Sequence, residues 1–213
     1  MNFGRVLLWV IACALGGCSA AGAIMHKVAG PPAVPAKFVP APKPLLVLVE
    51  NYSRQSSGHA DEDLLARYVE GELKEHKVAP VVDSTKLREL RMARPGDFHE
   101  LSISNLGRKV GAEQVLYVNI VESRIEPLLG DESVRTQTSV RVKMIDVSNG
   151  ETRWPTDMEA GFPLEYKSEW GTGIGRSEME IKQGIYRALS DRIAKLFYKW
   201  KPDQEEPEGF IGQ

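Results

Sequence analysis

The 213-residue chain is poor in cysteine and histidine and carries little net charge. Two cysteines are too few for a disulfide-rich scaffold. A formal net charge of -2 argues against a strongly basic nucleic-acid-binding protein, so no nucleic-acid partner is expected. No two of the four histidines have metal-ligand spacing, so we predict neither a metal site nor a cofactor. The histidines are His26, His59, His76 and His99.

Long apolar runs are also lacking, but a short one lies near the N-terminus. Val6 to Leu15 are ten consecutive apolar residues preceded by Arg5. A membrane-spanning helix needs about 20 such residues. A positive charge, a run of this length and small residues after it are typical of a secretory signal peptide.

The end of this segment, Leu15-Gly16-Gly17-Cys18, resembles a bacterial lipobox. The resemblance implies that residues 1–17 are a lipoprotein signal peptide and that Cys18 is lipidated at its thiol and its new amine. Ser19, the residue after this cysteine, resembles an outer-membrane sorting signal, since Asp at this position signals retention. We therefore expect a lipid-anchored protein of the cell envelope, held at the outer membrane and facing the periplasm. An ordinary secretory signal with an incidental cysteine, or a retained membrane anchor, are the alternatives.

Residues 18–44 are rich in Ala and Pro, with six prolines between 31 and 44. Proline fixes φ and removes backbone donors, so neither a helix nor a sheet is expected. We interpret the segment as a disordered, extended tether. Two alternatives are a peptide motif docked by another protein and partial packing of Phe38 and Val39 on the domain.

Residues 45–201 have the hydrophobic patterns of an α/β domain. Two stretches, 45–49 and 114–121, are apolar on both faces and predict buried strands. Strict alternation over 134–144 predicts a strand with one solvated face. Asn149-Gly150 predicts a hairpin into 151–154. A further short strand is predicted over 78–83.

Helices are predicted over 61–77, after Ser84, over about 98–110 with Gly111 as C-cap, and from Ser177 to about 201. Ser177 and Glu180 form a capping-box sequence. Residues 122–133 are interpreted as a connection, 153–176 as an irregular stretch and 202–213 as a disordered acidic tail. The predicted fold is a mixed sheet of about four to five strands with helices packed on it.

Two stretches carry a family resemblance: Gly111-Ala112-Glu113 before the strand at 114, and Ile145 to Glu151 (IDVSNGE). They are similar to the periplasmic α/β domain shared by the TolB amino-terminal domain, LpoB and CsgG. The 122–133 connection is too short for a curli-type transmembrane hairpin, and no TolB-like propeller is expected. The layout is nearest to the LpoB type, which implies a compact, tethered lipoprotein.

Two groups of side chains are candidate partner-binding surfaces. One is basic and suits an acidic partner or an anionic glycan, although a solvated helix face is the plainer interpretation. The other is aromatic and suits a protein partner, although such residues more often cover a sheet edge. The basic group is Lys86, Arg88, Arg91 and Arg94, and the aromatic group is Trp154, Tyr166 and Trp170.

Patterns for catalysis are weak. Gly171, Gly173 and Gly175 precede a helix, but their spacing differs from a dinucleotide-binding fingerprint, so a flexible loop is preferred to a phosphate site. Asp61 to Asp63 could hold a cation, but we interpret them as acidic residues that stabilise the positive end of a helix dipole. Ser56 and Ser57 lie in no nucleophile elbow.

We therefore expect a non-enzymatic envelope lipoprotein that binds another envelope protein through its α/β domain. The alternatives are a structural subunit of an envelope or secretion assembly, with homo-oligomerisation left open, and an envelope enzyme.

Overall fold

The computed structural model describes residues 31–51, 59–93, 95–98, 100–127, 133–171 and 177–202. These residues fall into two compact units, 36–198 and 31–35 with 199–202. In the smaller unit, Val34 and Trp200 exchange two backbone hydrogen bonds of 2.8 and 3.1 Å in an isolated antiparallel bridge. The predicted signal peptide, Cys18 and residues 203–213 lie outside the described ranges.

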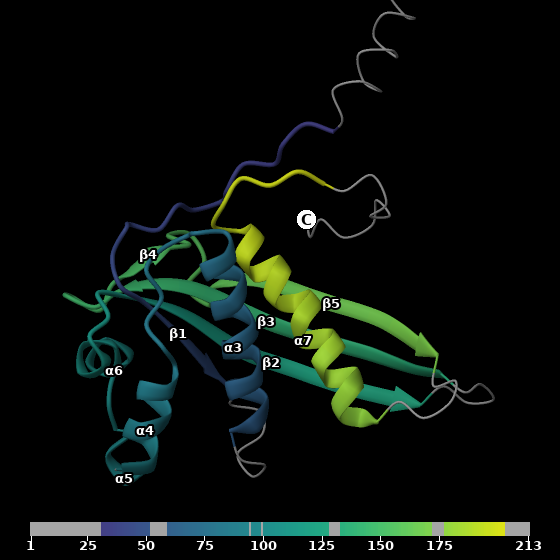
Figure 1. The fold of residues 1–213 in the computed structure, drawn as a ribbon, viewed down its shortest axis with the longest axis horizontal. Coiled ribbons are helices and arrows are strands. Elements are labelled where there is room, and N and C mark those ends of the chain that lie inside the picture. Colours follow the sequence, from purple (N-terminus) through teal and green to yellow (C-terminus); the bar gives the residue numbers. More distant parts are fainter. Residues whose placement is uncertain are drawn as a thin grey trace, which may run out of the picture. The chain divides into compact units, whose positions relative to one another are not determined.

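The larger unit is built on a five-stranded mixed sheet with helices packed on it, as predicted (Figure 1). β1 (Leu45–Glu50) runs parallel to β2 (Gln114–Pro127). β2 is antiparallel to β3 (Ser133–Asp146). The other edge of β3 pairs with both β4 (Thr152–Trp154) and β5 (Phe162–Gly171).

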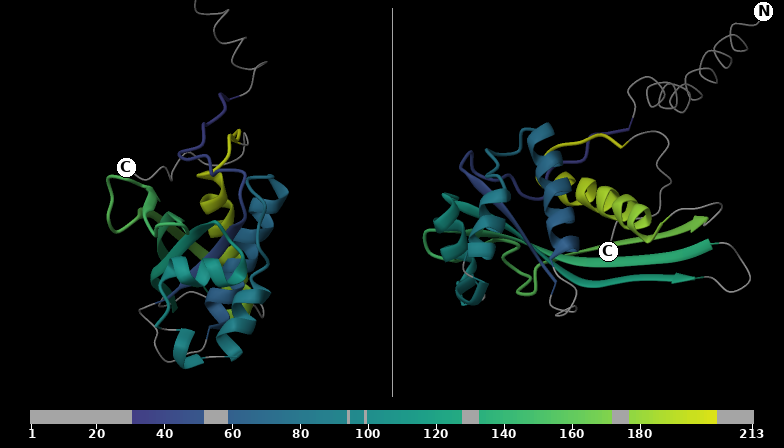
Figure 2. Two further views of the ribbon diagram at one scale, coloured as in Figure 1. Left: turned by 90° about the vertical axis from the view of Figure 1, so that its left-hand side faces the viewer. Right: turned by 60° about the horizontal axis from the view of Figure 1, so that its bottom comes forward.

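Helices cover both faces of the sheet (Figure 2). α3 (Ala60–Glu75) and α7 (Glu178–Lys195) pack on one face. α4 (Thr85–Ala93), the single turn α5 (Pro95–Phe98) and α6 (Ile103–Val110) pack on the other. The sheet is therefore the middle layer of three.

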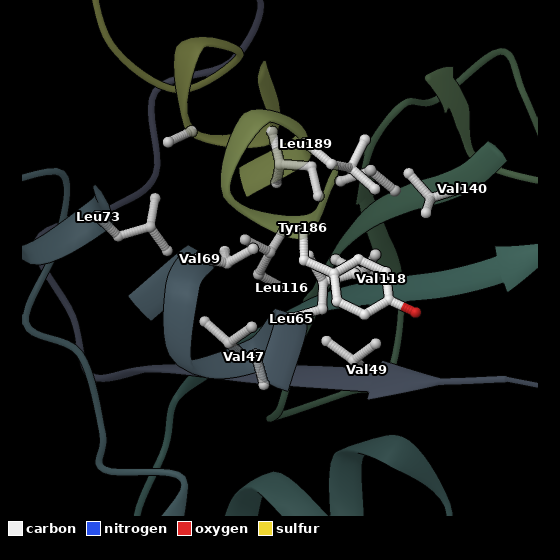
Figure 3. Packing of buried hydrophobic residues seen from close by; sticks show 14 of the residues in the cluster. Val47, Val49, Leu65, Val69, Leu73, Leu116, Val118, Val140, Tyr186 and Leu189 are labelled. Carbon is white, nitrogen blue, oxygen red and sulfur yellow. The ribbon is translucent and has the colours of Figure 1, made fainter. Parts of the chain in front are cut away.

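β1 contributes to both cores because it is buried on both faces. Val47 and Val49 point toward α3 and α7, where Figure 3 shows them close to Leu65 and Val69. Leu46 and Leu48 point to the opposite core, beneath α4 and α6. Alternate side chains of a strand point to opposite faces, so a strand between two helical layers must be apolar throughout.

Local capping signals place the ends of two helices. The Ser177 hydroxyl accepts from the backbone N–H of Glu180, whose carboxylate accepts from the backbone N–H of Ser177, so the predicted capping box is confirmed. Gly111 has φ of 81° and ends α6, as predicted. The last helix stops at Lys195, so the prediction that it continues to about residue 201 is wrong.

Two further boundaries differ from the predictions. The helix predicted over 98–110 is interrupted, because the Ser102 hydroxyl caps the first turn of α6 and keeps Ser102 itself extended. The strand predicted over 78–83 shortens to a parallel bridge between Leu45 and Val81. Pro80 lacks an N–H, so only its carbonyl can pair, with the N–H of Leu45 at 2.8 Å.

The largest difference is a three-stranded extension of the sheet, formed by residues 122–127, 133–139 and 165–171, which we call the arm. Part of the predicted connection 122–133 is the end of β2, and the predicted irregular stretch 153–176 contains β5. A bulge at Val121 breaks the alternation of β2, so that Ile120 and Ile125 face the same side.

Residues 36–44, which we assigned to the tether, are part of the larger unit. The backbone N–H groups of Lys37 and Phe38 donate to the carbonyl of Leu196 at 2.8 and 3.1 Å. Of the two residues for which packing was left open, Phe38 packs against the core and Val39 is 73% exposed.

Candidate functional site

α4 presents two of the four basic residues that we predicted as a patch. The helix starts where the backbone N–H of Thr85 donates to the Asp83 carboxylate at 2.8 Å, and hydrogen bonds from Thr85 lower the pKa of Asp83. Leu87 is buried against the sheet, whereas Lys86 and Arg88 are exposed. These two side chains can meet a partner without any rearrangement of the helix.

Arg91 is used differently, because its side chain is only 12% exposed. Its Nη1 donates to the Asp63 carboxylate of α3 at 3.2 Å. Its guanidinium carbon lies 5.0 Å from the centre of the Phe98 ring. Arg91 therefore joins α3 to α4 and α5, and Arg94 lies outside the described residues.

Trp154 sits in the middle of an aromatic cluster. Its ring centre lies 6.3 Å from Phe38 and 5.1 Å from Phe162 in stacked arrangements. Phe197 meets it edge-on at 5.7 Å. Trp154 is half-buried, so it closes the end of the core and offers a partner only part of its surface.

Tyr166 lies on the same side of the sheet as Trp154, beneath α7. The Arg192 guanidinium carbon of α7 lies 5.0 Å from its ring centre. Trp170 pairs with Val134 through the backbone, and its side chain is outside the described ones. The structure does not join the aromatic group to Lys86 and Arg88, because α4 packs on the opposite face of the sheet.

Two buried carboxylates on α3 had no signal in the sequence. Glu62 and Glu70 are 6% and 5% exposed, and burial raises the pKa of each. Hydrogen bonds from Ser84 and the Lys74 ammonium, 3.7 Å away, oppose the rise in the pKa of Glu70. Both glutamates occupy polar positions of an amphipathic helix, and only the approach of neighbouring segments buries them.

A second cluster lies where α3 and the segment after α7 meet. The rings of His76 and Tyr198 stack with centres 4.0 Å apart. Burial, followed by the charges of Asp191, Glu72 and Glu75, raises the pKa of Tyr198 to about 12. A tyrosine phenol is already neutral at neutral pH, so the raised pKa extends the protonated form of Tyr198 only into strongly alkaline solution.

Two acidic side chains in the first turn of α3 form ion pairs with basic side chains of other helices. Asp63 pairs with Arg91, and Asp61 lies 3.5 Å from the Lys182 ammonium of α7. Within the described ranges, no group of three or more His, Cys, Asp or Glu side chains is placed to hold a metal ion.

Gly171 ends β5, whereas Gly173, Gly175, Ser56 and Ser57 lie outside the described residues. Among the helices that the structure describes, none has the length and apolar character needed to cross a membrane.

Comparison with known proteins gives structural similarity at low sequence identity. No protein-family model matches the sequence, and no curated protein matches it either. Lipoprotein GNA1162 from Neisseria meningitidis is 18% identical with a TM-score of 0.46, over 72% of this chain and 99% of that one. A PelC dodecamer from Paraburkholderia phytofirmans is 16% identical with a TM-score of 0.42, over 79% and 95%. A minor lipoprotein from Acinetobacter baumannii is 12% identical with a TM-score of 0.40, over 76% and 98%.

Proposed function

We propose that this chain is a lipid-anchored envelope lipoprotein whose α/β domain binds another envelope protein without catalysis. The observation that carries the proposal is Leu15-Gly16-Gly17-Cys18 directly after a charged and apolar leader. Acyl chains on Cys18 would each contribute about 0.8 kcal/mol per buried methylene, so several chains make a stable anchor. Ser19 favours the outer membrane, with the domain facing the periplasm.

The exposed pair Lys86 and Arg88 on α4 is the surface that best suits a partner. Lys86 and Arg88 are two residues apart, so their side chains lie on different sides of the helix, and each can attract an acidic surface and steer its approach. Trp154 and Tyr166 contribute less in this proposal, because both are half-buried against the core.

The anchor is tested by Cys18→Ala in cells. We expect the variant to fold, to lose acylation and to move from the membrane to the soluble fraction. Cys13→Ala is the matched control, because that cysteine lies inside the proposed signal peptide and should leave acylation unchanged. If Cys18→Ala stays wholly with membranes after a high-salt wash, the proposed anchor is wrong or a second one exists.

The partner surface is tested by crosslinking in cells followed by pull-down. We expect the double variant Lys86→Glu with Arg88→Glu to lose most of the crosslinked product. Lys77→Glu with Lys199→Glu, at two exposed lysines outside α4, is the control because it changes the net charge by the same amount. Equal loss in both variants would indicate a general charge effect, and no loss in either would place the partner elsewhere.

A structural subunit of an assembly is the second candidate, favoured by an edge of the sheet. On the edge of β2 that pairs with β1, no strand in the described part of the chain continues the pairing beyond Asn119. Open edges are templates for strand pairing. Light scattering on a soluble form of residues 31–213 separates the candidates, since a monomer at high concentration disfavours self-assembly.

A further inference from the structure

One side of the sheet has no helix over the outer part of β2, β3 and β5. Val140, Val142 and Met144 of β3 point into the core beneath α3 and α7, so the residues between them point to the opposite side. On that side α4, α5 and α6 pack at the other end of the sheet, against residues that include Tyr117 and Ile145. Figure 2 shows no helix among the described residues on this side of the arm. We call this surface the open face and define it by the β3 residues Arg135, Gln137, Ser139, Arg141 and Lys143.

The charged side chains on the two flanks of the open face are paired with one another. Arg124 of β2 lies 2.6 Å from the Glu122 carboxylate, and Lys167 of β5 lies 3.1 Å from the Glu165 carboxylate. Glu165 also accepts a hydrogen bond of 2.8 Å from the Gln137 amide. These contacts balance the charge on both flanks.

Arg141 and Lys143, in the middle strand, are different. Both residues are half-buried, and within the described ranges neither side chain forms a hydrogen bond or an ion pair. The residues opposite Arg141 on the two neighbouring strands are Asn119 and Pro163, which carry no charge. A partly desolvated cation gains more from an incoming carboxylate than an exposed one does, because water screens its charge less.

Asn119 adds an unpaired polar atom beside these cations. Its Oδ1 is buried and accepts no hydrogen bond in the described part of the chain. Asn119 stands directly opposite Arg141, at a position where facing Cβ atoms are about 4.5–5.5 Å apart. A ligand that satisfies both residues offers an acceptor to the guanidinium and a donor to the amide oxygen.

We propose that the open face binds an extended acidic segment of a partner protein, with two carboxylates separated by one residue. Arg141 and Lys143 are two residues apart on one strand, so their Cα atoms are about 6.6–6.8 Å apart. Alternate residues of an extended segment have the same spacing and point to the same side. One carboxylate can therefore reach each cation, and the backbone N–H groups of the segment are donors for Asn119. This inference needs neither the proposed anchor nor the proposed surface on α4.

A polypeptide suits the open face better than a uniformly acidic polymer does. Glu122 and Glu165 lie on either side of Ser139, the next residue of the face after Arg141. Their carboxylates would repel an anionic glycan or an anionic lipid surface laid across the sheet. A peptide can place acidic side chains over the two cations and neutral side chains over the glutamates.

The experiment titrates two synthetic peptides into the isotope-labelled full chain, expressed with its own leader and purified in detergent, and follows the backbone amide NMR signals. Thr-Glu-Thr-Glu-Thr has its glutamates on one side when extended, whereas Thr-Glu-Glu-Thr-Thr has the same charge with its glutamates on opposite sides. The test variant is Arg141→Gln with Lys143→Gln, and Lys143→Gln alone serves if the double variant folds poorly. Lys77→Gln with Lys199→Gln is the matched control, because it removes two exposed cations outside the open face.

We expect the alternating peptide to shift the amide signals of β3 around Arg141 and Lys143. It should bind at least about threefold more tightly than the other peptide, and the β3 double variant should raise its dissociation constant at least about fivefold. The control variant should change that constant by less than about twofold.

Three results would overturn the inference. The first is equal binding of the two peptides, which would mean that only their charge matters. The second is loss of binding in Lys86→Glu with Arg88→Glu but not in the β3 variant, which would place the peptide on α4 and support the proposed function instead. The third is tighter binding of an oligogalacturonate than of the alternating peptide, which would identify an acidic glycan as the ligand.

Discussion

Gly161 is a glycine whose side-chain position is blocked by a backbone carbonyl. Its φ is 96°, and an added Cβ would lie 3.0 Å from both the Val142 carbonyl oxygen and the Lys143 Cγ. Gly111 has a similar φ of 81°, but nothing lies within 4 Å of its Cβ position. Substitution of Gly111 therefore tests backbone strain alone, whereas substitution of Gly161 tests backbone strain together with a steric contact.

We expect Gly111→Ala to cost about 1–2 kcal/mol of unfolding free energy, the price of a left-handed backbone for an L-residue. Gly161→Ala should cost more, because a backbone carbonyl of β3 must also shift. Urea unfolding of both variants measures the difference. Equal costs would show that the backbone carbonyl of β3 can shift without a measurable loss of unfolding free energy.

Glu70 should make stability depend on pH in a defined direction. Burial is the largest cause of its raised pKa, from an ordinary value of 4.5. The folded state then binds the proton more tightly than the unfolded chain, so the free energy of unfolding falls as pH rises above about 4.5 toward the folded-state pKa. Glu70→Gln removes this ionisation.

The stability of Glu70→Gln relative to the natural protein should therefore be greater at pH 7 than at pH 4. Paired urea titrations at the two pH values measure this change. Glu89→Gln, at an exposed position of α4, is the control and should show no such trend. A relative stability that is unchanged or reversed between the two pH values would contradict the assignment.

At the scale of the element, α7 is the helix that closes the larger core. Leu189 has no exposed surface, and Figure 3 shows it in the same core cluster as the sheet residue Val140. Leu189→Ala should cost about 2–5 kcal/mol, out of about 5–15 kcal/mol for a typical domain. Met179→Ala, on the first turn and 52% exposed, should change stability by less than about 0.5 kcal/mol.

Thermal and urea unfolding compare the two α7 variants. A small, equal effect would mean that α7 is peripheral to the fold. A large effect of Met179→Ala would mean that the first turn has a contact that its exposure does not reveal.

At the scale of the whole molecule, the outer edge of β5 is protected by side chains. Arg192 of α7 donates from Nη1 to the carbonyl of Glu165 at 2.9 Å. Pro163 has no N–H to offer a new strand, and Glu165 and Lys167 place charges along the edge. Charged residues, proline and covering side chains are the usual means of discouraging strand addition.

We expect Arg192→Ala to increase self-association at high protein concentration, because it uncovers the Glu165 carbonyl. Arg187→Ala is the control on the same helix, since Arg187 lies over the Tyr68 ring and not on the edge. Light scattering measures the association. Equal behaviour of both variants would mean that Arg192 does not guard the edge.

Several features were predictable because they depend on residues close together in the chain. The apolar run at 45–49 and the alternation at 134–144 set which faces are buried, whatever the neighbours are. The capping box at Ser177 and the left-handed turn at Gly111 likewise follow from local hydrogen bonding and backbone sterics. The lipobox is also a local pattern, and it remains a prediction.

Other features were decided only by tertiary structure. β5 alternates Phe162, Leu164 and Tyr166 inward, but it needed β3 as a partner before an irregular-looking stretch became a strand. Likewise, Arg91 became a link between helices, and residues 36–44 became part of the domain. Periodicity reports which side of an element is apolar, whereas pairing and polar contacts depend on distant residues that folding alone brings together.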